Sequence, residues 1–438
     1  MATPRSALED KVVATIREGR DELVELVAAL VACDTTAREN GDPARDEEKL
    51  QRLLAERLTA LGAETDLWEP DPLGGAGNRR FPGELGFAGR PQLAAWVRGR
   101  GGGRSLLLNG HIDAVDVEPR TEWASDPFSL VERDGKLYGR GVNDMKGGLA
   151  AYLTALEALR RLEVPLLGDV CYCSVTDEES SGAGGFAAVQ HGVACDAGLC
   201  GEPTGLNAWV ACRGSLTPHI TVRGRAGHAE MPQPHWRAGG AVNAIQKMQI
   251  VLEEIRRIGD EWLTRPDQQH SVLSPGTFVP TVIKGGSWEV TYPAECEVVS
   301  EIMYLPQHLD ADGTGRTIER EVQERIDRAA AADPWLAEHP LEWFWDGDVP
   351  PGEIPADHPL VGLVLEAAAG LGRPGRCDGF DSWHDAATFS QAGTPTLSFG
   401  PGGADSIHAV NEYTPVQDLL DVAAIIALTT MRWCGVAD

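Results

Sequence analysis

Residues 105–119 read SLLLNGHIDAVDVEP, and after a tryptophan-bearing loop residues 137–151 read LYGRGVNDMKGGLAA. The three consecutive leucines predict a buried strand that ends at the next Asn-Gly pair. His111 and Asp113 then follow at i, i+2 spacing, which places both side chains on the same side of an extended chain. Asp144 comes just after a glycine turn and opens a helical pattern. An imidazole and two carboxylates therefore gather where an α/β fold builds its sites, beyond the carboxyl ends of its strands.

The pattern on either side of this stretch predicts alternating strands and helices. Strands are expected at residues 93–97, 105–108, 170–175, 197–200 and 395–399, and helices at residues 7–32, 43–62, 144–162, 182–191, 359–371 and from 414 onward. A hairpin through the GRGGGR segment, residues 99–104, would join the first two strands. This alternation is typical of an α/β domain with a doubly wound, mostly parallel sheet.

After Arg213-Gly214 the pattern changes to a small α+β unit. Strands are expected at residues 216–222, 279–283, 296–304 and 341–345, and helices at residues 238–258 and 317–331. This order predicts a ferredoxin-like domain inserted into the first one. We therefore expect a catalytic domain of residues 1–213 and 351–438, and a lid and dimerisation domain of residues 214–350.

Composition narrows the class of protein. A chain of 438 residues suggests two domains, and its formal net charge of -28 argues against nucleic acid or an anionic membrane as a partner. No apolar run approaches the roughly 18 residues of a membrane span, and the N-terminal stretch has no signal-peptide core. The nine cysteines are scattered without a C-x-x-C pair. Reduced thiols in a cytoplasmic protein are the simplest interpretation.

Acidic and imidazole side chains follow the predicted strands of the outer domain. Such a cluster of carboxylates is costly without cations, and a pair of divalent metal ions would resolve it. Mixed ligands of this kind suit zinc, with cobalt or manganese as substitutes. Each motif alone is more often an ordinary strand end or a solvated turn, so the prediction depends on four of them coinciding with four strand ends. The residues concerned are His111 with Asp113, Asp144, Glu178-Glu179, Glu202 and His408.

Adjacent residues on an extended segment point in opposite directions. Only one of Glu178 and Glu179 can therefore easily bind a metal ion, which leaves the other near the attacking water. The spacing does not say which glutamate has which role.

Six motifs in a fixed order resemble the M20 metallopeptidase family, which includes acetylornithine deacetylase, succinyl-diaminopimelate desuccinylase, aminoacylase and glutamate carboxypeptidase. They are GHIDAVDVEP (110–119), WASDPFSLVERDGKLYGRGVNDMKGG (123–148), TDEESSGAGG (176–185), CGEPT (200–204), RAGHAE (225–230) and FGPGGADSIHAVNEY (399–413). They span most of the chain, and GRGVNDMKGG followed by DEESSG at this distance is highly specific.

The resemblance implies a role for each residue of the site. His111 and Glu202 would bind one metal ion, Glu179 and His408 the other, and Asp144 would bridge the two. Asp113 would hold the imidazole of His111, and Glu178 would be the general base. His228, from the inserted domain, would donate to the oxyanion, and in dimeric members it reaches across from the other subunit. The resemblance also implies a cis peptide between Asp144 and Met145.

The sequence departs from the family at the substrate side. Where members often read D-I-R-x-L-P, with an arginine for a substrate carboxylate, this chain reads E-I-M-Y-L-P with Met303. Either another basic residue, Arg213 or Arg237, substitutes, or the substrate lacks that carboxylate. Trp383 and His384 replace small residues before an aspartate, where Trp383 would narrow the pocket or pack, and His384 is expected to pack or to support a ligand.

These observations predict a dinuclear metal-dependent amidohydrolase. Its substrate would be a small N-acyl amine or N-acyl amino acid, and the protein would be a homodimer. A dipeptidase or carboxypeptidase of the same family is the alternative among enzymes. A non-catalytic metal-binding homologue is a further alternative, which the complete set of site residues disfavours.

Overall fold

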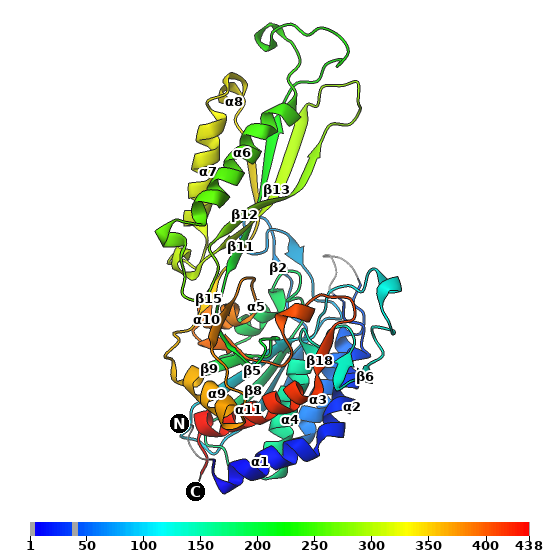
Figure 1. Ribbon diagram of the computed structural model, residues 1–438, viewed down its shortest axis with the longest axis vertical. Coiled ribbons are helices and arrows are strands. Elements are labelled where there is room, and N and C mark those ends of the chain that lie inside the picture. Colours follow the sequence, from blue (N-terminus) through cyan, green and yellow to red (C-terminus); the bar gives the residue numbers. More distant parts are fainter. Residues whose placement is uncertain (1–4, 37–42, 438) are drawn as a thin grey trace.

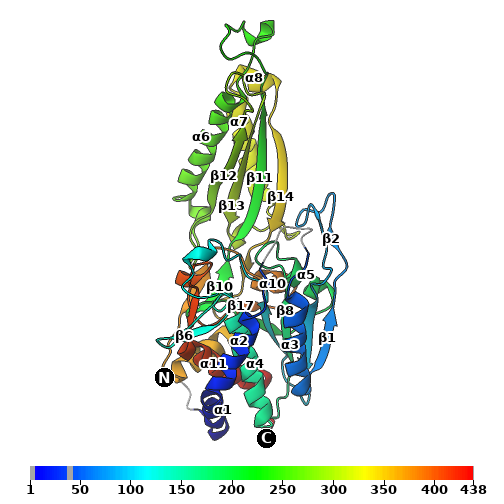
Figure 2. The ribbon, with the colours of Figure 1, turned by 90° about the vertical axis from the view of Figure 1, so that its right-hand side faces the viewer.

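The computed structural model of the protein describes residues 5–36 and 43–437. Two parts are stacked along the long axis of the molecule, a large mixed sheet with helices on both faces and a smaller antiparallel sheet with helices on one face (Figure 1). The view turned by 90° shows the same stacking, so the molecule is elongated (Figure 2).

The large sheet has nine strands: β1 (Glu64–Trp68), β4 (Gln92–Val97), β5 (Leu106–His111), β8 (Val170–Val175), β9 (Ala197–Cys200), β10 (Ala208–Cys212), β15 (Gly352–Glu353), β16 (Cys377–Phe380) and β17 (Thr396–Ser398). Their order is β1-β4-β8-β5-β9-β17-β10-β15, with β16 paired to β10. The four central strands β8, β5, β9 and β17 are parallel. Strands β1, β4 and β15 are antiparallel to their neighbours, as is β10 to β17. The expected mostly parallel sheet is therefore right only at the centre, and the sheet as a whole is mixed.

The expected hairpin between the first two strands is wrong, because β8 lies between β4 and β5. The GRGGGR segment does not turn back onto the sheet. Its backbone instead pairs with the residues that lead into β8, where the N–H groups of Arg100 and Gly101 donate to the carbonyls of Leu166 and Leu167 at 2.9 and 2.8 Å. This pairing separates β4 from β5 by one strand.

Helices cover both faces of the large sheet. One face carries α1 (Ala7–Glu18), α2 (Arg20–Val31), α3 (Glu47–Ala60), α4 (Lys146–Arg161), α9 (Pro359–Gly370) and α11 (Val416–Cys434), and the other carries α5 (Ala183–Gln190) and α10 (Ala386–Gln391). The single helix expected over residues 7–32 is two helices, because Gly19 ends α1, its N–H bonding to the Thr15 carbonyl.

Residues 214–349, called the inserted domain below, form the smaller sheet and its helices. They are β11 (Gly214–Arg223), α6 (Ala244–Trp262), β12 (Thr277–Gly285), β13 (Glu295–Tyr304), α7 (Arg316–Ala330), α8 (Pro334–Glu338) and β14 (Glu342–Val349). The strand order is β12-β13-β11-β14, and every pair is antiparallel. Apolar side chains of α6 and α7 pack together on one face of this sheet. Helix α6 begins later than expected, since the Asn243 side chain caps it by accepting from the Gln246 N–H.

Short elements complete the fold: β2 (Leu73–Gly74), β3 (Glu84–Leu85), β6 (Val131–Arg133), β7 (Lys136–Tyr138) and β18 (Tyr413–Pro415). Strand β7 lies between β6 and β18. The segment just before the glycine turn at Gly139 is therefore paired with the end of the last sequence motif, at Tyr413. Across residues 5–36 and 43–437, no helix is both long and apolar enough to span a membrane.

Candidate active site

Parallel strands bring the acidic and imidazole side chains to one edge of the large sheet. His111 is the last residue of β5, and Glu178 and Glu179 follow β8. Glu202 follows β9, and His408 lies in the loop after β17. The carboxyl ends of parallel strands lie at the same edge, so these residues meet there.

Asp144 reaches the same edge because the start of α4 packs closely against the end of β9. A Cβ atom on Gly148 would lie 2.0 Å from the carbonyl oxygen of Gly201, so only glycine allows this approach. The peptide between Asp144 and Met145 is cis, as the resemblance implies.

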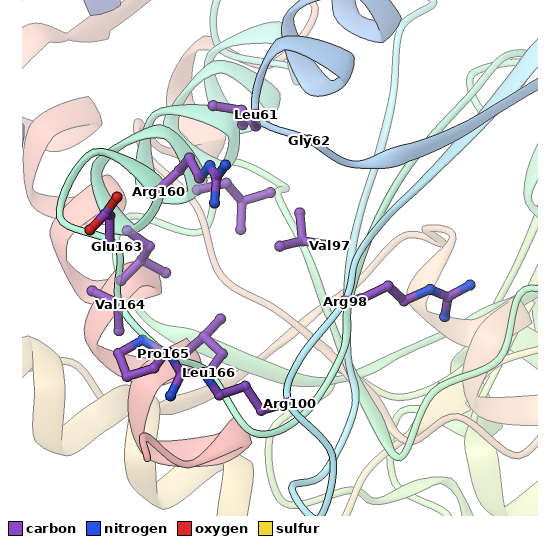
Figure 3. A pocket seen from close by; sticks show the side chains of 12 residues that line it. Leu61, Gly62, Val97, Arg98, Arg100, Arg160, Glu163, Val164, Pro165 and Leu166 are labelled. Carbon is purple, nitrogen blue, oxygen red and sulfur yellow. The ribbon is translucent and has the colours of Figure 1, made fainter. Parts of the chain in front are cut away.

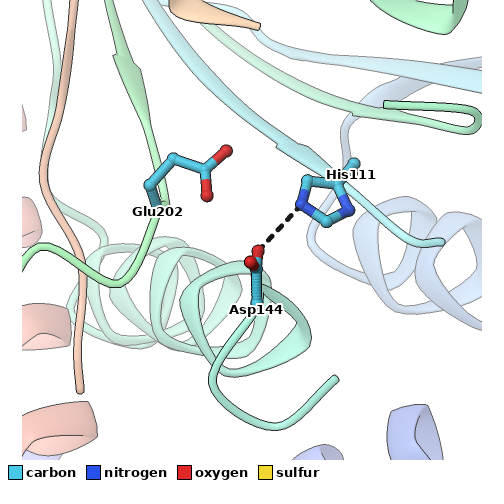
Figure 4. A group of neighbouring side chains, drawn as sticks. All are labelled: His111, Asp144 and Glu202. Carbon is cyan, nitrogen blue, oxygen red and sulfur yellow. Dashed lines mark hydrogen bonds and ion pairs between the residues drawn. The ribbon is translucent and has the colours of Figure 1, made fainter. Parts of the chain in front are cut away.

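Two groups of three potential metal ligands share Asp144. One is His111, Asp144 and Glu202, and the other is Asp144, Glu179 and His408; in each, one ligand atom per residue lies within 4.8 Å of the others. The side chains of the first group converge in Figure 4. Asp144 presents Oδ1 to His111 Nε2 at 3.1 Å and Oδ2 to His408 Nε2 at 3.7 Å. His408 Nε2 also lies 3.0 Å from Glu179 Oε2.

Asp113 fixes the imidazole of His111 from behind. His111 Nδ1 lies 2.9 Å from the Asp113 carbonyl oxygen and 3.5 Å from its Oδ1. A donated Nδ1–H leaves Nε2 free to bind a metal ion. Asp113 Oδ2 also accepts from the backbone N–H of Glu179 at 3.0 Å, which ties the histidine to the loop that bears the glutamates.

The pKa values of this cluster show an excess of buried negative charge. Burial, followed by repulsion from neighbouring carboxylates, raises the pKa of Glu178 and Glu202 well above the ordinary value of a glutamate. Burial alone would lower the pKa of His111, but its bonds to Asp113 and Asp144 raise it well above the ordinary value. Burial also opposes ionisation of Asp144, yet the hydrogen bond from His111 lowers the pKa of Asp144. Bound protons or cations would offset this excess of negative charge.

The donor set fits divalent cations. Oε1 of Glu179 and Oδ1 of Asp113 are buried without a hydrogen-bond partner among the described residues, and Glu179 belongs to a ligand group. Two imidazoles and three carboxylates are ligands that zinc, cobalt and manganese accept.

Glu412 positions the loop that carries Asp144, a role that we do not predict from the sequence. Its buried carboxylate accepts the backbone N–H groups of Gly141, Asn143 and Asp144 at 2.9, 2.7 and 3.1 Å, and pairs with Arg140 at 2.7 Å. The signal was present as the Asn-Glu-Tyr end of the last motif, but only the fold shows where the side chain points.

A cavity of about 260 Å³ opens beside the two ligand groups, between the large sheet and the inserted domain. Met303 lines it, as do Glu178 and Glu179. The full set is Asp144, Glu178, Glu179, Ser180, Ser181, Glu202, Ser215, Glu301, Met303, Val349, Phe380, Ser382, Trp383, Ile407 and His408. A second cavity of about 530 Å³ lies elsewhere, between Leu61, Val97 and Pro165, and contains none of the ligand residues (Figure 3).

The two arginines considered for a substrate carboxylate and the predicted oxyanion donor do not reach the cavity. Arg213 instead donates to the carbonyls of Asp381 and Pro275 at 2.6 and 2.9 Å. Arg237 pairs with Glu338 at 2.6 Å, within the inserted domain. His228 lies in the loop between β11 and α6, which Figure 1 shows at the end of the inserted domain farthest from the large sheet. Within one chain, His228 therefore does not meet the ligand groups.

His384 and its neighbour add buried groups behind the site. His384 belongs to neither ligand group, and burial lowers its pKa to about 4, so the imidazole is neutral. Its Nδ1 lies 3.4 Å from Ser398 Oγ. Burial raises the pKa of Asp385 to about 7, and both of its oxygens are without a hydrogen-bond partner among the described residues.

Residues 107–432 match the model of the family "Peptidase family M20/M25/M40". An N-formyl-4-amino-5-aminomethyl-2-methylpyrimidine deformylase of Halalkalibacterium halodurans is 28% identical over 97% of each chain. A succinyl-diaminopimelate desuccinylase of Xanthomonas oryzae is 30% identical over 90% of this chain and 96% of its own.

Solved structures share the fold at lower identity. Human carnosine dipeptidase 1 superposes with a TM-score of 0.72 at 17% identity, covering 98% of this chain and 100% of its own. A dinuclear metal binding peptidase from the M20 family of Bacillus subtilis has a TM-score of 0.64 at 14% identity, covering 95% and 99%. The match over most of the chain and the two relatives confirm the resemblance: the chain is an amide-bond hydrolase that belongs to the M20/M25/M40 peptidase family.

Proposed function

We propose that this hydrolase removes an N-acyl group from a small amine, using two divalent metal ions. The observation that carries the proposal is the pair of ligand groups that share Asp144. His111 and Glu202 would hold one ion, Glu179 and His408 the other, and Asp144 would bridge them. Zinc is the first candidate, and cobalt or manganese could replace it. When bound, the ions supply a water of lowered pKa and polarise the amide carbonyl.

Glu178 is the proposed general base. It lines the cavity but belongs to neither ligand group, and its Oε2 lies 3.9 Å from His111 Nε2. The carboxylate would take a proton from the attacking water and pass it to the leaving nitrogen. Asp113 would keep His111 in the tautomer that binds metal, and Glu412 would hold the loop of Asp144 in place.

The two relatives support an N-acyl substrate. By name, one removes a formyl group from an aminomethylpyrimidine and the other a succinyl group from diaminopimelate. The first substrate has no carboxylate, which agrees with Met303 at the position of the family arginine and with Arg213 outside the cavity. A neutral or basic amine is therefore the proposed leaving group, and activity on free dipeptides would favour the alternative.

A second copy of the chain would complete the site if His228 is the oxyanion donor. We propose that residues 1–213 and 351–438 form the catalytic domain and residues 214–350 the lid and dimerisation domain. Strand β11 lies inside its sheet, between β13 and β14, and offers no free edge. Strand β12 does form an edge, and Val279, Val282 and Ile283 on it are exposed, as is Ile245 on α6. This edge is the proposed homodimer surface.

A substrate panel tests the function. Protein stripped of metal and reloaded with zinc, cobalt or manganese would be assayed on N-formyl, N-acetyl and N-succinyl amines and on dipeptides. We expect hydrolysis of at least one N-acyl amine and its loss on chelation. Hydrolysis of dipeptides alone would replace the proposed function with the peptidase alternative.

A further inference from the structure

The inserted domain supplies one wall of the active-site cavity, and this wall carries one acidic side chain, Glu301. It sits on β13 beside β11, and the hydroxyls of Ser215 and Thr217 both donate to its carboxylate, the latter at 3.1 Å. Ser215 and Met303 line the same cavity. The two hydroxyls hold the carboxylate in place without neutralising its charge.

The described lining of the cavity offers Glu301 no ammonium or guanidinium partner. Among the described residues that line it, none is lysine or arginine, and Met303 stands where the family often has an arginine. The guanidinium of Arg213 is occupied by the carbonyls of Asp381 and Pro275. A substrate carboxylate placed beside Glu301 would therefore be repelled by it, with no lysine or arginine in the described lining to pair with that carboxylate.

Two aromatic side chains lie on the catalytic-domain side of the cavity. The ring of Phe380 stacks on Trp209 with centroids 4.5 Å apart, which fixes its orientation. Trp383 donates its Nε1–H to the Pro350 carbonyl at 3.0 Å, so its one polar atom is already used. What remains available to a ligand is apolar ring surface.

We infer that Glu301 selects the leaving amine. It accepts a hydrogen bond from an N–H donor on a flat, aromatic amine that packs against Phe380 and Trp383, and it rejects amines that bear a carboxylate. This inference rests on the proposed function, because the amine is the product of N-acyl hydrolysis. It goes further by assigning specificity to a carboxylate of the inserted domain.

Two matched substrate pairs test the assignment at about pH 8, because burial raises the pKa of Glu301 and a higher pH favours its ionised form. The first pair is N-formylbenzylamine and N-formylphenylglycine, which differ by one carboxylate. The second pair is N-formyl-4-amino-5-aminomethyl-2-methylpyrimidine and its analogue without the 4-amino group. Each is assayed with the metal-loaded wild type, with Glu301→Gln and with Glu297→Gln. Glu297 lies on the same strand four residues away, outside the cavity, and is the control.

The wild type should prefer the first member of each pair. Glu301→Gln should lower kcat/KM for the aminopyrimidine about 10-fold or more, mainly through KM, and should reduce both preferences. Glu297→Gln should leave both preferences unchanged. Glu301→Asp, which keeps the charge, should still discriminate against N-formylphenylglycine and replaces the glutamine variant if that variant does not fold.

The outcomes separate the two proposals. If the wild type hydrolyses N-formylbenzylamine but prefers N-formylphenylglycine, or if Glu301→Gln changes neither preference, the assignment of Glu301 is overturned and the proposed function stands. If no N-formyl or other N-acyl amine is hydrolysed by the metal-loaded wild type, the proposed function fails and this assignment fails with it.

Discussion

The adjacent glutamates Glu178 and Glu179 offer a paired test of the proposed roles. Glutamine has nearly the shape of glutamate but neither accepts a proton at neutral pH nor carries the negative charge that a metal ion prefers. Glu178→Gln should therefore remove the base and keep the ligands. Glu179→Gln should remove a ligand that lies 3.0 Å from His408 and should keep the base.

The positions of the two glutamates set the expected losses of kcat and of metal affinity. Loss of a general base typically costs about 100- to 10,000-fold in kcat. In the described contacts, Glu178 touches neither His408 nor Asp144. The metal affinity of Glu178→Gln should therefore change by less than about 10-fold, which is a smaller loss than is typical on mutating residues that support metal ligands. Glu179→Gln should weaken the ion shared with His408 and Asp144 by roughly 100-fold or more.

Metal content after dialysis against a buffered metal concentration measures the affinity, and kcat at saturating metal measures the chemistry. Asp113 orients Glu179 through its backbone N–H, which either substitution keeps, so circular dichroism should match the wild type. If Glu178→Gln loses metal while Glu179→Gln keeps both ions and loses kcat, the roles within the pair are reversed.

Three further predictions concern stability, assembly and specificity. Burial raises the pKa of Asp385 to about 7 from an ordinary 3.8, so it binds a proton more tightly when folded and destabilises the metal-free protein as pH rises through that range. Between about pH 5 and pH 7, the melting temperature of metal-free Asp385→Asn should thus fall less than that of the metal-free wild type. An equal fall would contradict the raised pKa of Asp385. His228→Ala should lower kcat by roughly 100- to 1000-fold with unchanged metal content. If sites are shared between subunits, a mixture of His228→Ala and Glu178→Gln that is unfolded and refolded together should regain about a quarter of wild-type activity. No recovery, or a fully active monomer, would exclude a trans role. Met303→Arg should shift the preference of the enzyme toward N-acyl amino acids over their amides, and an unchanged preference would mean that Met303 does not contact the substrate.

The local pattern at the strand ends was enough to predict the convergence of the ligand residues. His111 ends a central strand and Glu179 and Glu202 each follow one, and the carboxyl ends of parallel strands lie at a common edge. The glycine turn before Asp144 indicated a helix start, and the structure shows how closely that helix packs, in the contact between Gly148 and Gly201.

The positions of the strands that flank the four central ones could not be predicted in the same way. Strand β4 pairs with β8 and not with β5, because bonds from Arg100 and Gly101 to the residues before β8 decide the route of the chain. No local signal marks such a long-range pairing. Strand β10 was also missed, since its five residues AWVAC have no alternation to distinguish them.

Side-chain direction was the other limit of sequence reasoning. Glu412 and Glu301 both stand in motifs that the sequence makes visible, yet only the fold shows that one holds the loop of Asp144 and the other faces the cavity. Arg213 was a reasonable candidate for a substrate carboxylate, but two backbone carbonyls occupy its guanidinium.

The central claim is that two metal ions share Asp144, and metal stoichiometry measured together with activity tests it most directly. Protein stripped with a chelator, reloaded with zinc and freed of excess metal would be analysed by inductively coupled plasma mass spectrometry beside Asp144→Ala. The account predicts about two ions per chain in the wild type, no activity in the stripped protein, and loss of both ions in the variant. Full activity of the stripped protein, or an Asp144→Ala variant that still binds two ions, would contradict it.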